Sequence, residues 1–239
     1  NEGFETTSTD QYSPNFPDGW STVDSYTGNN DRYRWNVYYY EKGTMTGTHC
    51  ASVDSPMFTG GEDGGEGPRE EILLTPELNL DNTYQLSFDW MAASKAAIDE
   101  GKYDFQVRIV TDGNVEGAET IWSFNNATQL KENGNVPYPW TGWATYKTMI
   151  DLSKWQGKSI KVAFVYKMLK ATANVLDIDN VMVKQFTPAT GPKGVLSKKQ
   201  YNFGEVYMNS KMFSNKITLK NEGKNGLKIT SIDYPQGIG

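Results

Sequence analysis

The clearest hydrophobic pattern of the chain lies in the run EILLTPELNLDNTYQLSFDW, residues 71–90. Its second half places four large apolar residues at every second position: Tyr84, Leu86, Phe88 and Trp90. Because side chains of a β-strand alternate between two faces, this spacing predicts a half-buried strand. The Asp81-Asn82 pair before it predicts a turn, so the run is interpreted as two strands joined by a turn. Four apolar side chains on one face require a second sheet to cover them.

The same alternation recurs further along the chain. It spans Tyr103 to Ile109 and Ile160 to Met168, and an almost continuous apolar run extends from Val175 to Phe186. Aromatic residues crowd Tyr33 to Tyr40, and Asn1 to Glu5 is interpreted as a short first strand. Together these segments predict roughly ten short strands separated by turns, which is the pattern of an all-β fold, an antiparallel β-sandwich of the jelly-roll type.

The composition of the chain changes after Phe186. Residues 187–193 contain two prolines, as an interdomain linker often does. From Thr187 onward, eight lysines and three acids give a charge of +5, which leaves −11 for the rest of a chain with net charge −6. We therefore predict a domain over 1–186, a linker over 187–193 and a second, incomplete β domain over 194–239. Its predicted strands are Val195-Leu196, Tyr201 to Tyr207, Lys216 to Leu219 and Leu227 to Ile232.

Composition excludes several classes of function. The acidic main domain argues against a nucleic-acid partner, because phosphate binding needs a basic face. No apolar run approaches the ~20 residues that a membrane-spanning helix needs, so we expect no membrane insertion in this segment. The chain opens on polar residues without a visible secretory leader, which does not argue for the cytoplasm. Its single cysteine, Cys50, excludes an internal disulfide.

Aromatic residues provide the candidate ligand-binding surface. Aromatic faces bind the apolar faces of sugars, and neighbouring Asn and Asp side chains supply hydrogen bonds. Alternation assigns Tyr33, Trp35, Val37 and Tyr39 to the core face of one strand. The remaining candidates for a sugar-stacking platform are Tyr38, Tyr40 and Trp140.

Several segments, taken in order, resemble a known family of bacterial surface proteins. They are FE at 4–5, FPDGW at 16–20, LLTPELNL at 73–80, LSFDW at 86–90, IDLSKWQGKSIKVAF at 150–164 and LDIDNVMV at 176–183. This set resembles the cleaved-adhesin or choice-of-anchor J jelly rolls, which are MAM-like, concanavalin-like sandwiches, over about residues 1–186. The YNFGEV, LKNEG and LKI segments of the tail resemble the start of a choice-of-anchor D or Hydin-type immunoglobulin-like domain.

The resemblance also implies a structural calcium ion that ties the first strand to the last. It places Glu5, Asp179 and Asn180 at the metal, with Asn180 standing where a second acid is common in the family. Calcium accepts six to eight hard oxygen ligands, and two carboxylates brought together by the fold would repel without a cation. The loop from Asp24 to Asp31 resembles a second calcium loop, but only its two end residues are acidic, so we expect a solvated loop.

The sequence gives little support for catalysis. The sole histidine, His49, and the sole cysteine, Cys50, are neighbours, and neighbours on a strand point to opposite faces, so they cannot form a dyad. The Asp177 and Asp179 run resembles the central acids of some glucanases, but flanking glutamates are absent.

We therefore expect a non-enzymatic, monomeric, cell-surface or secreted binding module for adhesion or glycan binding. Its partner would be a glycan or a surface protein. A glycoside hydrolase and a purely structural spacer domain remain the alternatives.

Overall fold

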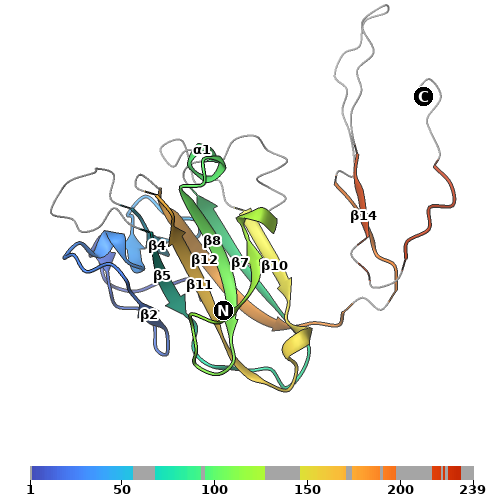
Figure 1. Ribbon diagram of the computed structural model, residues 1–239, viewed down its shortest axis with the longest axis horizontal. Coiled ribbons are helices and arrows are strands. Elements are labelled where there is room, and N and C mark those ends of the chain that lie inside the picture. The colour runs from blue at the N-terminus through green and yellow to red at the C-terminus, as the bar shows by residue number, and fades with distance from the viewer. Residues whose placement is uncertain are drawn as a thin grey trace, which may run out of the picture. The chain divides into compact units, whose positions relative to one another are not determined.

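A computed structural model describes residues 2–55, 68–92, 95–126, 146–170, 174–188, 191–197, 217–221, 223 and 226–232. The chain divides into two compact units, Asn1–Phe186 and Thr187–Gly239. The first unit is an antiparallel β-sandwich (Figure 1), which confirms the predicted fold class.

One sheet of the sandwich, here the first sheet, has the strand order β1-β3-β4-β12-β7-β10. Its strands are β1 (Tyr12–Ser13), β3 (Asn36–Tyr39), β4 (His49–Val53), β12 (Leu176–Gln185), β7 (Tyr84–Ala92) and β10 (Tyr146–Asp151). Each neighbouring pair runs antiparallel. The last long strand of the unit, β12, therefore lies at the centre of the sheet, between β4 and β7.

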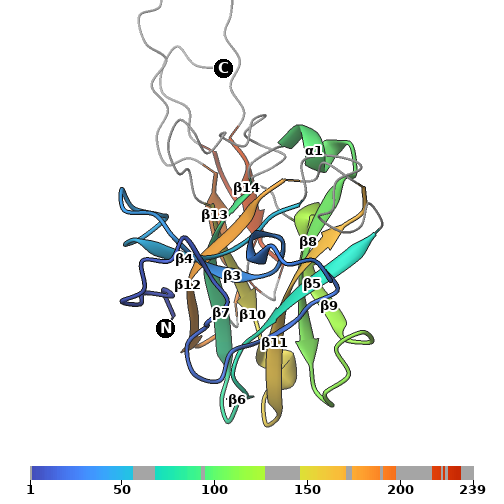
Figure 2. The same cartoon turned by 90° about the vertical axis from the view of Figure 1, so that its left-hand side faces the viewer.

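The second sheet has the order β2-β5-β11-β8-β9, and β6 also pairs with β11. Its strands are β2 (Ser21–Val23), β5 (Arg69–Leu74), β6 (Leu78–Asn79), β8 (Tyr103–Val110), β9 (Glu119–Ser123) and β11 (Ser159–Met168). Figure 2 shows β3, β4 and β12 in one layer and β5, β8 and β11 in the other. Short helical segments connect the strands: η1 (Asp31–Tyr33), α1 (Lys95–Asp99), η2 (Phe124–Asn126) and η4 (Ser153–Trp155). Within the described residues, no helix is long and apolar enough to cross a membrane.

The core between the sheets is rich in aromatic rings. Phe88 of β7 is fully buried, and its ring lies edge-on to Phe105 of β8 at 5.9 Å and to Phe164 of β11 at 5.2 Å. Edge-to-face pairs of this kind are favourable because the positive edge of one ring meets the negative face of the other. Trp90, two residues further on, is also fully buried, and its indole Nε1 donates to the hydroxyl of Thr148 at 2.9 Å. The face predicted from alternation along residues 84–90 is therefore the core face.

Strands do lie on either side of the predicted turn at Asp81-Asn82, but they do not pair with each other. The run passes from β5 in the second sheet through β6 to β7 in the first sheet, so it crosses the sandwich. Pro76 lacks an amide donor, and the Thr75 amide and hydroxyl both bond to Val162 of β11. These contacts hold the segment against the second sheet before the chain crosses.

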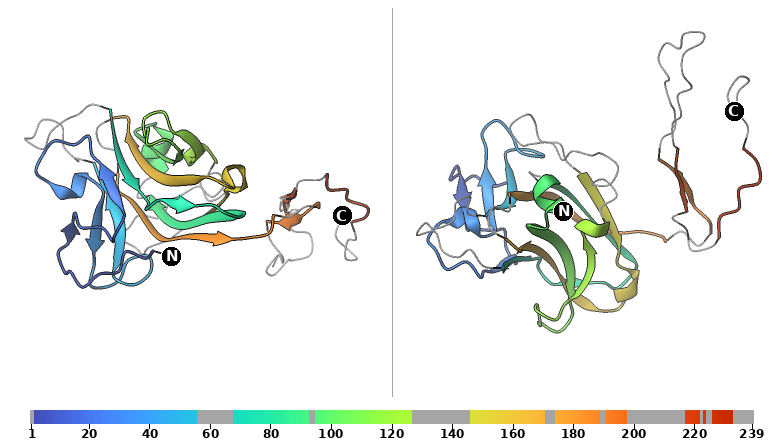
Figure 3. Two further views of the ribbon diagram at one scale, coloured as in Figure 1. Left: turned by 90° about the horizontal axis from the view of Figure 1, so that it is seen from below. Right: turned by 45° about the horizontal axis from the view of Figure 1, so that its top comes forward.

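The predicted first strand over residues 1–5 is wrong. Glu2 makes a single antiparallel bridge to Val181 of β12, and Phe4 then adopts a left-handed φ of 58° that ends any extended run. The Phe4 side chain is nevertheless fully buried in the core. Figure 3 also shows the N-terminal end of the chain close to the first unit's strands.

The second unit contains one described antiparallel pair of strands, β13 (Gly194–Leu196) with β14 (Leu219–Asn221). The predicted strand over Leu227 to Ile232 forms no ladder there, and Tyr201 to Tyr207 lies outside the described residues. The immunoglobulin-like character of this unit stays a prediction.

Replacing Phe88 by Ala should lower the free energy of unfolding by about 3 to 5 kcal/mol, because it removes buried contacts with both sheets and leaves a cavity. Met149→Ala on β10 is the matched control, since its side chain is 64% exposed and should change stability little. Urea unfolding followed by tryptophan fluorescence measures both. Equal losses for the two variants would contradict the assignment of Phe88 to the core.

Candidate functional site

Three tyrosines form a row on the outer face of the first sheet, near its β1 edge. We call Tyr12, Tyr38 and Tyr40 the tyrosine strip. Tyr12 pairs directly with Tyr38 across β1 and β3, with ring centroids 5.5 Å apart. Tyr40, two positions beyond Tyr38, lies nearly parallel to it at 6.5 Å. All three side chains are half-buried, so each ring is partly accessible.

The strip contains two of the three aromatic residues expected to bind a ligand. Of the predicted core face, Trp35 and Val37 are buried between the sheets. Tyr33 instead lies in η1 against Tyr26, and Tyr39 is only half-buried, because β3 is shorter than the aromatic run. Trp140 lies outside the described residues. Tyr12 is absent from the expectation, because β1 has only two residues and shows no alternation that would reveal it.

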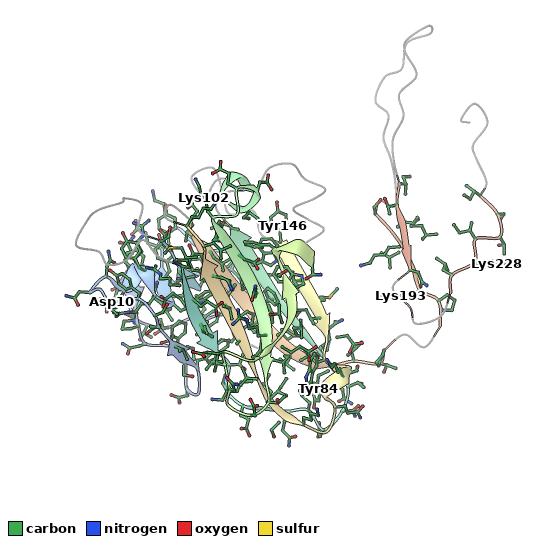
Figure 4. The ribbon with its side chains drawn as sticks, viewed as in Figure 1. Asp10, Tyr84, Lys102, Tyr146, Lys193 and Lys228 are labelled. Carbon is green, nitrogen blue, oxygen red and sulfur yellow. The ribbon has the colours of Figure 1, made fainter. Side chains whose placement is uncertain are left out.

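An open polar groove adjoins the strip. It has a volume of about 840 Å³ and is lined by Asp10, Gln11, Tyr12, Thr27, Gly28, Asn29, Asn30 and Asp31. Two separate segments therefore build it: the residues that lead into β1 and the loop that leads into η1. Figure 4 labels Asp10 on the side of the first unit opposite Tyr146 of β10, so the groove lies near the β1 edge of the first sheet.

A second polar site surrounds the turn at residues 44–48. Glu5 accepts hydrogen bonds from the backbone amides of Thr48 and His49, each at 3.1 Å, although its side chain is 50% exposed. Its other oxygen lies 3.2 Å from the Thr48 hydroxyl and 3.2 Å from Nδ1 of His49. Although burial opposes the effect, these contacts lower the pKa of Glu5.

Asp179 of β12 contacts the same turn. Its carboxylate is fully buried and accepts the amides of Asn180 and Thr46. Burial is the main cause that raises the pKa of Asp179 to about 7, and the negative charges of Glu5 and Asp89 add to the rise. The fold therefore brings acidic groups together where two of them disfavour the ionisation of Asp179.

Asn180 completes this cluster. It has a left-handed φ of 51°, which Asn tolerates better than most residues. Its Nδ2 donates to the Thr46 hydroxyl at 2.7 Å and to Asp89 at 2.9 Å. The expected metal residues Glu5, Asp179 and Asn180 therefore all meet the turn at residues 44–48.

The donor set around this turn fits calcium in part. Carboxylate oxygens are the ligands that calcium prefers, and a cation would offset both the burial and the neighbouring negative charges that raise the pKa of Asp179. Among the described residues, however, no three His, Cys, Asp or Glu side chains form a group able to hold a metal ion. A calcium ion here would also need main-chain, amide or water oxygens, all of which it accepts.

Asp177 is a buried carboxyl group on the outer face of the first sheet, a position that the sequence analysis did not predict. Leu176 and Ile178 are core residues, so alternation directs Asp177 to the outer face of the first sheet, where its exposed fraction is 1%. Neither carboxyl oxygen has a hydrogen-bond partner in the described structure, although the Ser52 hydroxyl is near enough to lower the pKa. Burial outweighs that effect and raises the pKa of Asp177 to about 7, with a further contribution from the negative charge of Asp54.

An arginine fills the loop from Asp24 to Asp31. The Arg34 guanidinium donates to the main-chain oxygens of Gly28 and Tyr26, and pairs with the Asp31 carboxylate at 3.3 Å. Main-chain oxygens and carboxylates are also what a calcium ion would use. The guanidinium thus binds the kinds of oxygen that a calcium ion would use, and only part of the loop is solvated, because Tyr26 is buried.

The only histidine and cysteine of the chain face different surroundings. His49 is buried, and its two ring nitrogens contact Glu5 and the main-chain oxygen of Ser8. Cys50 is fully buried, and burial raises the pKa of its thiol well above the usual value. A buried thiol with a raised pKa is a poor nucleophile.

Comparison with known proteins shows the fold and nothing finer. No protein-family model and no curated protein matches the chain. A solved structure of the K3 cleaved adhesin domain of Lys-gingipain from Porphyromonas gingivalis W83 is 18% identical, with a TM-score of 0.50, and the match covers 78% of this chain and 98% of that one. The K1 domain of the same protein is 17% identical over 72% and 94% of the two chains, with a TM-score of 0.49. The module TmCBM61, solved with β-1,4-galactotriose, is 11% identical over 71% and 90%, with a TM-score of 0.43.

Asp177→Asn should stabilise the protein selectively at high pH. The folded-state pKa of about 7 lies above the ordinary value of 3.8, so the protonated group favours folding at low pH and this contribution is lost as pH rises through 7. Each unit of pKa difference corresponds to about 1.4 kcal/mol. Urea unfolding should show the variant more stable than wild type at about pH 8.5, with the difference fading toward about pH 4.

The exposed Asp18→Asn variant controls for the loss of one negative charge and should show no such pH dependence. A stability difference for Asp177→Asn that is the same at both pH values would contradict a protonated buried carboxyl group.

Proposed function

We propose that this chain is a non-catalytic, cell-surface or secreted binding module that captures glycans on the outer face of its first sheet. The observation that carries the proposal is the tyrosine strip, a row of partly accessible rings beside a polar groove. Aromatic faces supply contact area for the apolar faces of sugar rings, and the amide and carboxylate groups nearby can bind hydroxyls. Tyr38, Tyr40 and the predicted Trp140 would stack against the ligand.

The burial of the acidic residues favours binding over glycoside hydrolysis. A glycosidase needs two carboxyl groups on either side of the scissile bond, in reach of the substrate. Asp177 and Asp179 on β12 are both buried, with 1% and 0% of their surface exposed. A sugar chain lying on the sheet would not reach them without displacing the side chains above.

A structural calcium ion at Glu5, Asp179 and Asn180 belongs to the same proposal. Its role would be to hold the N-terminal segment against β12, where Glu2 already bridges to Val181. The ion would supply positive charge to the carboxylates, and Asp179 would have to be ionised to hold it. The extracellular setting that belongs to the same proposal would supply calcium.

Tyr40→Leu should weaken glycan binding about tenfold while leaving the fold intact, because leucine preserves apolar volume but lacks a flat aromatic face. A glycan array identifies the ligand for wild type, and isothermal titration calorimetry then measures the dissociation constants of wild type and variant.

Tyr84→Leu is the matched control, since Tyr84 is a half-buried tyrosine of β7 bonded to Asp81 rather than a member of the strip. Release of reducing sugar by wild type would favour the hydrolase alternative. Absence of both binding and hydrolysis across the array would leave the spacer alternative.

Calcium should raise the melting temperature and a chelator should lower it. A ligand bound only by the folded state stabilises it by about 2.7 kcal/mol at a hundredfold excess over its dissociation constant. Asp179→Asn should remove most of the shift, and magnesium should substitute poorly because it demands a tighter octahedral shell. The shift should be larger at about pH 8 than at about pH 6, because protons compete for Asp179.

Asp18→Asn serves as the control, since this exposed turn residue is not among the described hydrogen-bond partners of Asp179. An unchanged melting temperature in chelator and in millimolar calcium, with no metal found by elemental analysis, would contradict a calcium site.

A further inference from the structure

The polar groove shares one wall with the tyrosine strip. Tyr12 belongs to both, since its ring lies against Tyr38 and its side chain lines the groove. Burial raises the pKa of the Tyr38 phenol, and a side-chain hydrogen bond with Gln11, another lining residue, partly opposes the rise. The main-chain oxygen of Gln11 accepts the Tyr39 amide at 3.1 Å. The groove and the strip are therefore one continuous surface.

The groove is held in place by buried contacts beneath its loop. Arg34 donates to the main-chain oxygen of Gly28, and its guanidinium carbon lies 5.4 Å from the ring centre of Tyr26. Arg69 approaches the same ring at 5.0 Å. The Tyr26 amide is in turn fixed by the buried carboxylate of Glu71 at 2.8 Å. A loop fixed in this way loses little conformational entropy when it binds a ligand.

The lining is acidic and rich in amides. Asp10 and Asp31 contribute carboxylates, Gln11, Asn29 and Asn30 contribute amides, and no Lys or Arg is among the described lining residues. The Asp31 charge is partly balanced by Arg34, whereas Asp10 is exposed and its carboxylate has only the Ser8 hydroxyl as a described partner. Amide and carboxylate groups bind neutral hydroxyls well, but an anionic ligand would meet repulsion.

We propose that the groove is the hydrogen-bonding half of a single site that takes a neutral oligosaccharide and rejects acidic ones. This inference rests on the proposed glycan binding and adds a ligand class and a second set of residues. One sugar unit stacks on the tyrosine strip, and the adjoining units extend past Tyr12 into the groove. There Gln11 and Asn29 bind hydroxyl groups, and Asp10 accepts hydroxyl hydrogen bonds while it repels carboxylated or sulfated sugars.

The experiment titrates the full chain with purified oligosaccharides by isothermal titration calorimetry. The neutral probes are xylo-, cello- and β-1,4-galacto-oligosaccharides from disaccharide to hexasaccharide, and the acidic probes are oligogalacturonates of the same lengths. Asn29→Ala and Asp10→Asn alter the groove, and Gln156→Ala, an exposed amide after η4, is the matched control.

Asn29→Ala should weaken binding of the longest neutral probe about threefold to tenfold, the worth of one hydrogen bond, while the disaccharide is unaffected. Asp10→Asn should reduce the preference for neutral over acidic probes, and Gln156→Ala should behave as wild type. If Tyr40→Leu weakens binding but Asn29→Ala and Asp10→Asn bind every probe as wild type does, the groove is not part of the site and this inference alone fails. If wild type binds no glycan at all, the proposed function fails together with it.

Discussion

The alternation along β12 is the constraint on which the rest of the first unit depends. Leu176 and Ile178 must face the second sheet to complete the core, and the backbone then sends Asp177 and Asp179 to the opposite face. On that face both carboxyl groups are nevertheless buried rather than solvated. The sheet therefore carries ionisable groups with a raised pKa beneath the residues that line its outer face, and it must either keep them protonated or supply a cation.

The sequence predicts which face of a strand is buried, but it predicts less well which strands pair with each other. Alternation over residues 84–90 predicts the core face correctly, because burial of Phe88 and Trp90 is a local consequence of spacing. It does not show that β5 and β7 belong to different sheets, since that choice depends on hydrogen bonds to β11, far along the chain. The left-handed φ of Phe4 likewise has no signal in the sequence, because the pattern around it is compatible with a strand.

The candidate site likewise combines residues that alternation predicts with residues that only tertiary contacts bring together. Alternation separates Tyr38 from the core residues on its own strand, but Tyr12 joins it only through the pairing of β1 with β3. The groove is assembled from residues 10–12 and 27–31, which are brought together by tertiary contacts. Arg34 could have been noticed as a basic residue close after an acidic loop, yet only the structure shows its guanidinium among the loop's main-chain oxygens.

Ligand binding on the outer face of the first sheet can be tested directly. Amide NMR spectra recorded while a neutral oligosaccharide is added would locate the contact residue by residue. Binding on this face predicts shifts at residues 10–12, 27–31 and 36–40, with β5, β8 and β11 unchanged. Shifts centred on the second sheet, with the tyrosine strip unaffected, would contradict it.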